Sequence, residues 1–128
     1  MKETLPQRPP ERDLKKRTKE FALRVIKLVE SLPKTQTTRV IGNQLLRSST
    51  SVPANYRASC RARSKAEFTA KLGIVEEETD ESVFWMEMLV DAGLVKVSRV
   101  EELMDEGNQL TAIWVTSINT ARGGTRRS

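Results

Sequence analysis

The residues best suited to chemistry in this chain are the cations of its basic middle segment. Between Pro33 and Ala66 the sequence has no acidic residue and seven basic ones. On a helix with 100° per residue, four of the arginines fall within an arc of about 80°. They are Arg39, Arg47, Arg57 and Arg61, and Arg63 and Lys65 follow them. Since such a basic stripe can neutralise phosphates along a nucleic-acid backbone, we predict an RNA- or DNA-binding surface formed by these six residues.

The chain also contains an acidic segment with which the basic stripe could form ion pairs. From Glu76 to Asp91 the chain has seven acidic residues and no basic one. Carboxylates at this density can pair with the arginines, within one chain or between subunits, so that the charges serve assembly. Glu77, Glu78 and Glu81 have a spacing that could in principle bind a divalent metal, but arginine partners or solvent are the simpler expectation. The sequence leaves a nucleic-acid adaptor and a protein-interaction scaffold both open.

The composition excludes most enzyme classes that a sequence can reveal. The chain has no histidine, which removes the Ser-His-Asp triad, the Cys-His pair and imidazole metal sites. Its six glycines form no phosphate-binding loop, and Cys60 has no resolving cysteine. We therefore expect no enzyme activity, metal, cofactor or small-molecule substrate. One cysteine, no apolar leader and no apolar run of about 18 residues predict a cytoplasmic protein without a membrane partner.

Four helices must position these residues. Apolar seams at three- and four-residue steps predict a first helix from Asp13, as its cap, to Leu32 and a second one capped by Thr37 or Thr38. Capping boxes at Ser64–Glu67 and Ser98–Glu101 predict the starts of the third and fourth helices. Gly93 is predicted to end the third helix, and 123–124 the fourth. The fold class is all-α: an antiparallel up-down bundle over 13–122, after a disordered segment 1–12 and before a basic tail 123–128.

One segment of the third helix is apolar almost all the way round. Residues 83–90 read VFWMEMLV, whereas a surface helix shows a single apolar stripe. A helix of this kind must be covered on two sides, and in so small a domain the second cover is another subunit. The predicted interface residues are Val83, Phe84, Trp85 and Met88.

Two stretches of the sequence resemble a known family. QLLRSSTSVPANYRASCRARSKAEF, from Gln44 to Phe68, and EEETDESVFWMEML further along are similar to the small four-helix-bundle proteins encoded in intervening sequences of bacterial large-subunit ribosomal RNA genes. The resemblance covers roughly 13–122. It implies a homopentameric barrel of antiparallel bundles. A related branch, the accessory protein of diversity-generating retroelements, is similar in shape and binds nucleic acid and a reverse transcriptase. Beyond fold and assembly, the resemblance implies little about function.

Overall fold

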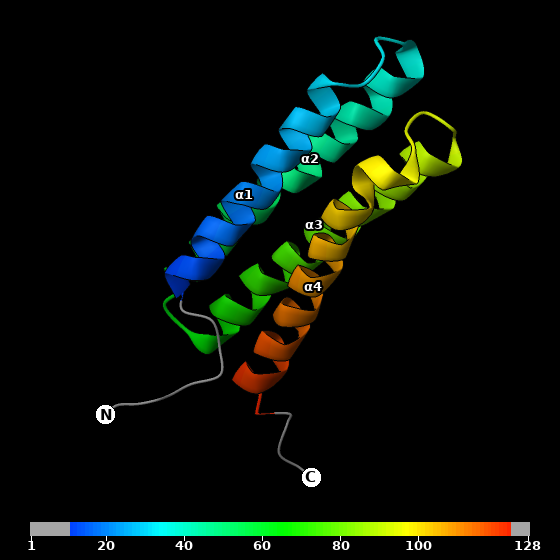
Figure 1. The fold of residues 1–128 in the computed structure, drawn as a ribbon. Helices are drawn as coiled ribbons and strands as arrows, with labels where there is room; N and C mark the ends of the chain where they lie inside the picture. Colours follow the sequence, from blue (N-terminus) through cyan, green and yellow to red (C-terminus); the bar gives the residue numbers. More distant parts are fainter. Residues whose placement is uncertain (1–10, 124–128) are drawn as a thin grey trace.

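The computed structural model describes residues 11–123, with side chains from Asp13 onward, and this part of the chain contains four α-helices and no strand. They are α1 (Glu11–Glu30), α2 (Gln36–Ser59), α3 (Lys65–Asp91) and α4 (Val97–Ala121). Figure 1 shows the helices side by side, α1 against α2 and α3 against α4, with successive helices pointing in opposite directions. The prediction of an all-α, four-helix protein is confirmed. Residues 1–10 and 124–128, which hold most of the predicted disordered segment and tail, lie outside the described residues.

Each helix contributes one predicted apolar seam to a common core. The seam of α1 is buried at Phe21 and Val25, and that of α2 at Leu45 and Val52. At the centre lies Trp114 of α4, which is fully buried and packs its ring against Tyr56 with the centroids 5.1 Å apart. Trp114 is therefore a packing anchor of the core.

Polar groups inside the core are joined across helices. The indole Nε1 of Trp114 donates to Thr79 Oγ1 at 3.0 Å, which links α4 to α3. The hydroxyl of Ser82 donates to Ser48 Oγ at 3.0 Å, which links α3 to α2. An unpaired buried donor costs about 1–3 kcal/mol, so the bond of the Trp114 indole favours one arrangement of α3 and α4 over others. The two serines also bond carbonyls of their own helices, so their mutual bond adds to this preference without leaving a donor unpaired elsewhere.

The helix ends confirm two of the predicted signals. The hydroxyl of Ser64 accepts the amide of Glu67 at 3.0 Å, so the first capping box starts α3 at the expected place. At the other end of α3, Gly93 has a φ of 75°. The amides of Gly93 and Leu94 return to the carbonyls of Val90 and Leu89 at 2.9 Å each, which is a Schellman motif.

Three helix starts differ from the prediction. Helix α1 begins at Glu11, so Asp13 lies in its first turn, where a carboxylate still favours the helix dipole. The cap of α2 is Thr35, whose hydroxyl accepts the amide of Thr38 at 3.2 Å, because Thr38 itself is buried. Helix α4 begins at Val97 after Lys96, which makes no side-chain cap bond. There the half-buried Leu94 and Val95 pack against the core, and this packing determines where the chain turns.

Candidate nucleic-acid interface

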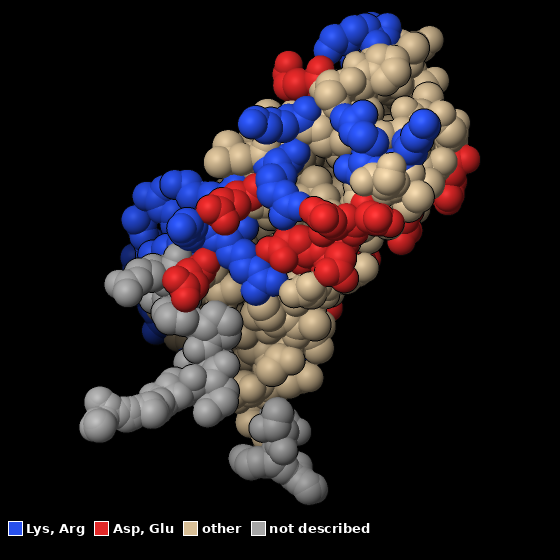
Figure 2. Space-filling model, viewed as in Figure 1, with Lys and Arg blue, Asp and Glu red and all other residues tan. Residues whose placement is uncertain are grey.

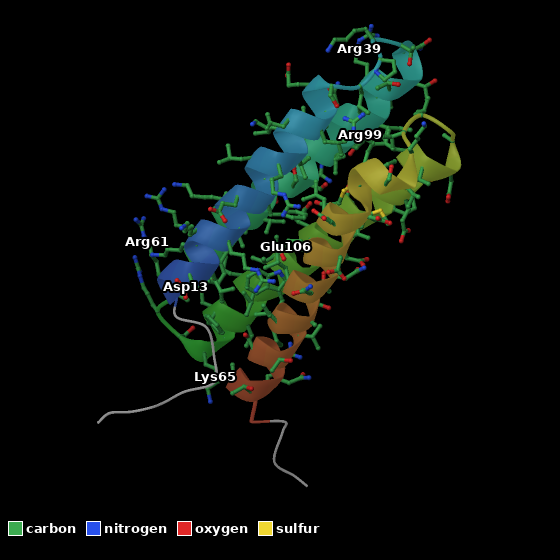
Figure 3. The ribbon with its side chains drawn as sticks, viewed as in Figure 1. Asp13, Arg39, Arg61, Lys65, Arg99 and Glu106 are labelled. Carbon is green, nitrogen blue, oxygen red and sulfur yellow. The ribbon has the colours of Figure 1, made fainter. Side chains whose placement is uncertain are left out.

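Five of the six residues of the predicted site lie toward the two ends of the molecule, and the sixth, Arg47, lies in the middle of α2. Arg39 is in the first turns of α2, whereas Arg57 is in the last turn and Lys65 begins α3. Figure 3 shows Arg39 at one end of the molecule and Arg61 and Lys65 toward the other. From Arg39 to Arg57 the axis of α2 runs about 27 Å. The stripe therefore divides, and its larger part is an α2–α3 basic cluster of exposed residues: Arg57, Arg61, Arg63 and Lys65.

Arg47 forms ion pairs with acidic residues of α3. Its guanidinium donates to Glu78 at 3.2 Å and also to Glu81, so it links α2 to α3. The hydrogen bond to Glu81 is the main cause that raises the pKa of Arg47, and desolvation opposes it. For this residue the pairing of stripe and acidic segment holds within the chain, although its side chain stays 51% exposed. The same contacts occupy Glu78 and Glu81, two of the three carboxylates with metal-compatible spacing.

Glu81 connects this ion pair to the aromatic residues of α3. It accepts a hydrogen bond from Trp85 Nε1 at 2.9 Å, and this bond is the main cause that lowers the pKa of Glu81. Arg47 lowers that pKa further, while burial opposes both effects. Trp85 in turn contacts Phe84 edge to face, with the ring centroids 4.8 Å apart. Arg47, Glu81 and Trp85 thus form one continuous polar cluster beside an exposed apolar surface.

The apolar segment of α3 divides between the core and that surface. Phe84 and Met88 are 46% and 36% exposed and lie one helical turn apart, so this chain leaves their face of α3 partly uncovered. Trp85 is half-buried. Val83, which was predicted to lie at the interface, is only 4% exposed. It belongs to the core because α4 presents Gly107 to it, and a glycine leaves room for the valine side chain.

A second group of cations was missed by the sequence analysis. Lys15, Lys16 and Lys19 are exposed on the N-terminal half of α1, which lies beside the C-terminal half of α2. Figure 2 shows basic side chains gathered over this part of α1. In the sequence, their position on the side of the helix away from the buried seam could have indicated an exposed basic surface. Arg17 is different, since it contacts Glu106 at 2.7 Å and holds α1 to α4.

Other kinds of site find no support within the described part of the chain. Between residues 11 and 123, no helix combines the length and apolar character needed to cross a membrane. The acidic residues and the cysteine in the same range form no group of three that could hold a metal ion.

Comparison with known proteins identifies the family. The family described as 23S rRNA-intervening sequence protein matches residues 11–116. Among solved structures, the chain is similar to a protein of unknown function from the S23 ribosomal protein family of Bacteroides thetaiotaomicron. That match has a TM-score of 0.79 and 29% identity, and it covers 85% of this chain and 97% of that one. A search of curated proteins gives no match. Because the family match spans most of the described helices, this chain belongs to the 23S rRNA-intervening sequence protein family.

Proposed function

We propose that this protein is a non-catalytic, cytoplasmic adaptor that binds nucleic acid through the α2–α3 basic cluster and the neighbouring lysines of α1. One observation supports this proposal above the others. Arg17 and Arg47 have carboxylate partners, but no described carboxylate lies within ion-pair distance of Arg57, Arg61, Arg63 or Lys65. Exposed arginines and a lysine that gather at one end, with no described carboxylate near enough to pair with them, are suited to an external polyanion.

The chemistry of this surface favours contact with phosphates over contact with bases. Guanidinium groups bind phosphate oxygens in pairs, while stacking of bases requires exposed aromatic rings. The aromatic residue nearest in sequence, Tyr56, is 6% exposed and packs on Trp114. Binding through this surface is therefore expected to depend strongly on salt and weakly on nucleotide sequence.

Filter binding of a single-stranded RNA across a salt series tests the proposal. Replacing two arginines, Arg57→Gln with Arg61→Gln, should flatten the log–log salt dependence by about 1.4, since each neutralised phosphate of a single strand contributes about 0.7. The matched control is Arg47→Gln, from the same predicted stripe, which should leave the slope unchanged because Arg47 is paired with α3. If the wild-type protein binds neither RNA nor DNA at about 50 mM salt, the adaptor function is wrong.

We infer a second candidate function from the exposed apolar face of α3. Phe84 and Met88 lie beside the Arg47–Glu81–Trp85 cluster, in which charges already serve contacts between helices. An interaction scaffold would use this face to join copies of an antiparallel up-down bundle into a homopentameric barrel, and its charges would serve assembly. Loss of assembly without loss of RNA binding on changing this face would separate the two functions.

A further inference from the structure

Three hollows meet at the end of the molecule that carries Arg39. The first, about 260 Å³, lies between α1 and α4, and a second of about 650 Å³ adjoins it. These two share Ser31 and Arg99 in their walls. The third, about 260 Å³, lies between α1 and α2 and shares Leu32 and Pro33 with the second. The three hollows are thus neighbours around the connection between α1 and α2, and we call them together the end track.

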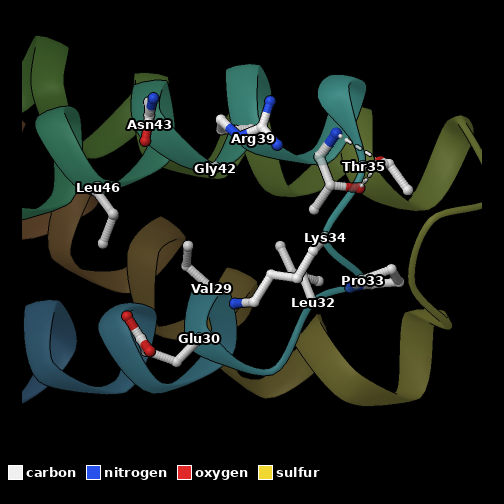
Figure 4. Close-up of a pocket in the computed structure, with 11 residues that line it drawn as sticks. Val29, Glu30, Leu32, Pro33, Lys34, Thr35, Arg39, Gly42, Asn43 and Leu46 are labelled. Atoms are coloured by element: carbon white, nitrogen blue, oxygen red, sulfur yellow. Dashed lines mark hydrogen bonds between the residues drawn. The ribbon is translucent and has the colours of Figure 1, made fainter.

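The end track is lined mainly by cations. Its walls contain Arg24, Lys27, Lys34, Arg39, Lys96 and Arg99, against two carboxylates, Glu30 and Glu102. All six cations are exposed, and none lies within ion-pair distance of a carboxylate among the described side chains. Figure 4 shows Lys34 extending across the hollow between α1 and α2, with Arg39 on the adjoining helix. Like charges that line adjoining hollows with few carboxylates among them repel one another, so a bound anion would relieve that repulsion.

A hydrogen bond holds Arg99 in a defined position at the middle of the end track. Its guanidinium donates to Ser31 Oγ at 2.7 Å, so α4 and the end of α1 meet at the point where the first two hollows join. The first turn of α4 has no acidic residue and no side-chain cap, and Ser98 from that turn lines the first hollow. The positive end of the α4 dipole therefore adds to the charge of the side chains.

The lining combines apolar surface with cations. The middle hollow is lined by Leu32, Pro33, Leu94 and Val95 together with Lys96 and Arg99, and the other four cations line the hollows beside it. A nucleic-acid strand likewise combines charged phosphates with sugars and bases that have apolar faces. A small anion would contact only one of the three hollows.

The end track and the α2–α3 basic cluster lie toward different ends of α2. About 27 Å of helix axis lies between Arg39 and Arg57. In this interval the exposed side chains of α2 include the neutral Asn43, Thr50 and Ala54 and also Arg47, which is paired with α3. Along α1 the interval is shorter, because Lys19 lies about 7.5 Å of helix axis before Arg24 of the end track. The two sites are therefore distinguished by their residues, and a test needs a strand short enough to occupy one of them.

We propose that the end track is a second nucleic-acid-binding site, which takes the phosphates of a single strand and enables one chain to hold two strands. This inference rests on the proposed function only for the identity of the ligand. The two sites use different residues, so they can fail independently.

The test is the number of strands bound per chain. A labelled oligouridylate too short to span about 27 Å is titrated against the full-length protein, and binding is followed by fluorescence anisotropy at low salt. Wild type should bind two strands per chain. The double variants Arg24→Gln with Arg99→Gln, and Arg57→Gln with Arg61→Gln, should each bind one, and the combined variant none. Lys27→Gln with Lys96→Gln repeats the first change without breaking the Arg99–Ser31 bond, and thermal melts check folding.

Each outcome decides between the sites. The inference is wrong if both end-track double variants still bind two strands per chain. It is also wrong if the wild-type protein binds a single strand and Arg57→Gln with Arg61→Gln abolishes that binding. If only the end-track changes remove binding, the track stands and the α2–α3 cluster is wrong. The last experiment is competition with polyglutamate at matched ionic strength. If it displaces the strand from the Arg57→Gln, Arg61→Gln variant as well as unlabelled oligouridylate does, the track binds acidic protein and the inference fails.

Discussion

Gly107 sets how closely α3 and α4 approach each other. A Cβ atom on this residue would lie 2.6 Å from Cγ2 of Val83 and 3.5 Å from Cε1 of Phe21. Both neighbours are buried, and a valine in a helix has little freedom to rotate away. The absent side chain thus allows a third helix, α1, to reach the same point of the core.

Exchange of Gly107 for alanine tests this packing. Although alanine favours a helix, Gly107→Ala should lower the free energy of unfolding by about 1–3 kcal/mol, because an extra methyl group overpacks a full core. The control is Gly73→Ala in α3, where the new methyl group meets no atom within 4 Å. That change should stabilise the protein by about 0.5–1 kcal/mol through helix propensity. Urea unfolding measures both, and equal effects of the two changes would contradict the packing argument.

At the scale of the helix, the four starts differ in how they are fixed. Helices α2 and α3 each have a hydroxyl that accepts an amide of the first turn, from Thr35 and Ser64 respectively. Helix α4 follows directly on the Schellman motif at Gly93, and its start has no such bond. Removal of a hydroxyl should therefore matter at α2 and α3 and have little effect at α4.

Alanine at three positions tests this difference. Ser64→Ala and Thr35→Ala should each destabilise the protein by about 1 kcal/mol, the usual cost of a lost cap. Ser98→Ala, at the capping box predicted for α4, should stay within about 0.5 kcal/mol because its hydroxyl caps nothing. Thermal melts of the three variants give the comparison. If Ser98→Ala lowers the stability as much as Ser64→Ala does, the start of α4 predicted from the sequence is correct.

How much the sequence could predict depended on whether a feature is local. The buried seams follow from the helical period, so Phe21, Leu45 and Trp114 could be assigned to the core. The partner of Arg47 could not, because it depends on how far α2 is displaced along α3, which no local pattern encodes. The burial of Val83 likewise depends on a glycine in another helix. The two-ended arrangement of the cations needed the arrangement of all four helices.

For the whole molecule, the distribution of charge suggests where copies of the chain would meet. From Gly107 to Ala121, α4 has no charged residue. Figure 2 shows a broad uncharged area over the C-terminal half of this helix. Phe84 and Met88 of α3 add exposed apolar side chains to the uncharged surface of the molecule. Surfaces with few charges and large apolar side chains are typical of contacts between subunits.

Light scattering tests the proposed assembly. The wild-type protein should have a mass about five times the 14.5 kDa of one chain. Phe84→Asp with Met88→Asp should reduce this mass while the circular dichroism stays helical, because charges would be buried at a subunit contact. The control is Leu23→Asp with Val40→Asp, at residues 59% and 57% exposed on α1 and α2, which should leave the mass unchanged. A wild-type monomer at micromolar concentration would contradict the pentamer.

The bond between Ser48 and Ser82 has a consequence for motion. A displacement of α2 along α3 by one turn, about 5.4 Å, would break this bond and the external Arg47–Glu78 contact together. The buried bond between Trp114 and Thr79 joins α4 to α3 in the same way. The described side-chain bonds from α1 to the other helices, at Arg17 and just beyond its end at Ser31, lie at the surface. Slow breathing of the molecule, and the entry of water that accompanies it, should therefore involve α1 moving against the other three helices.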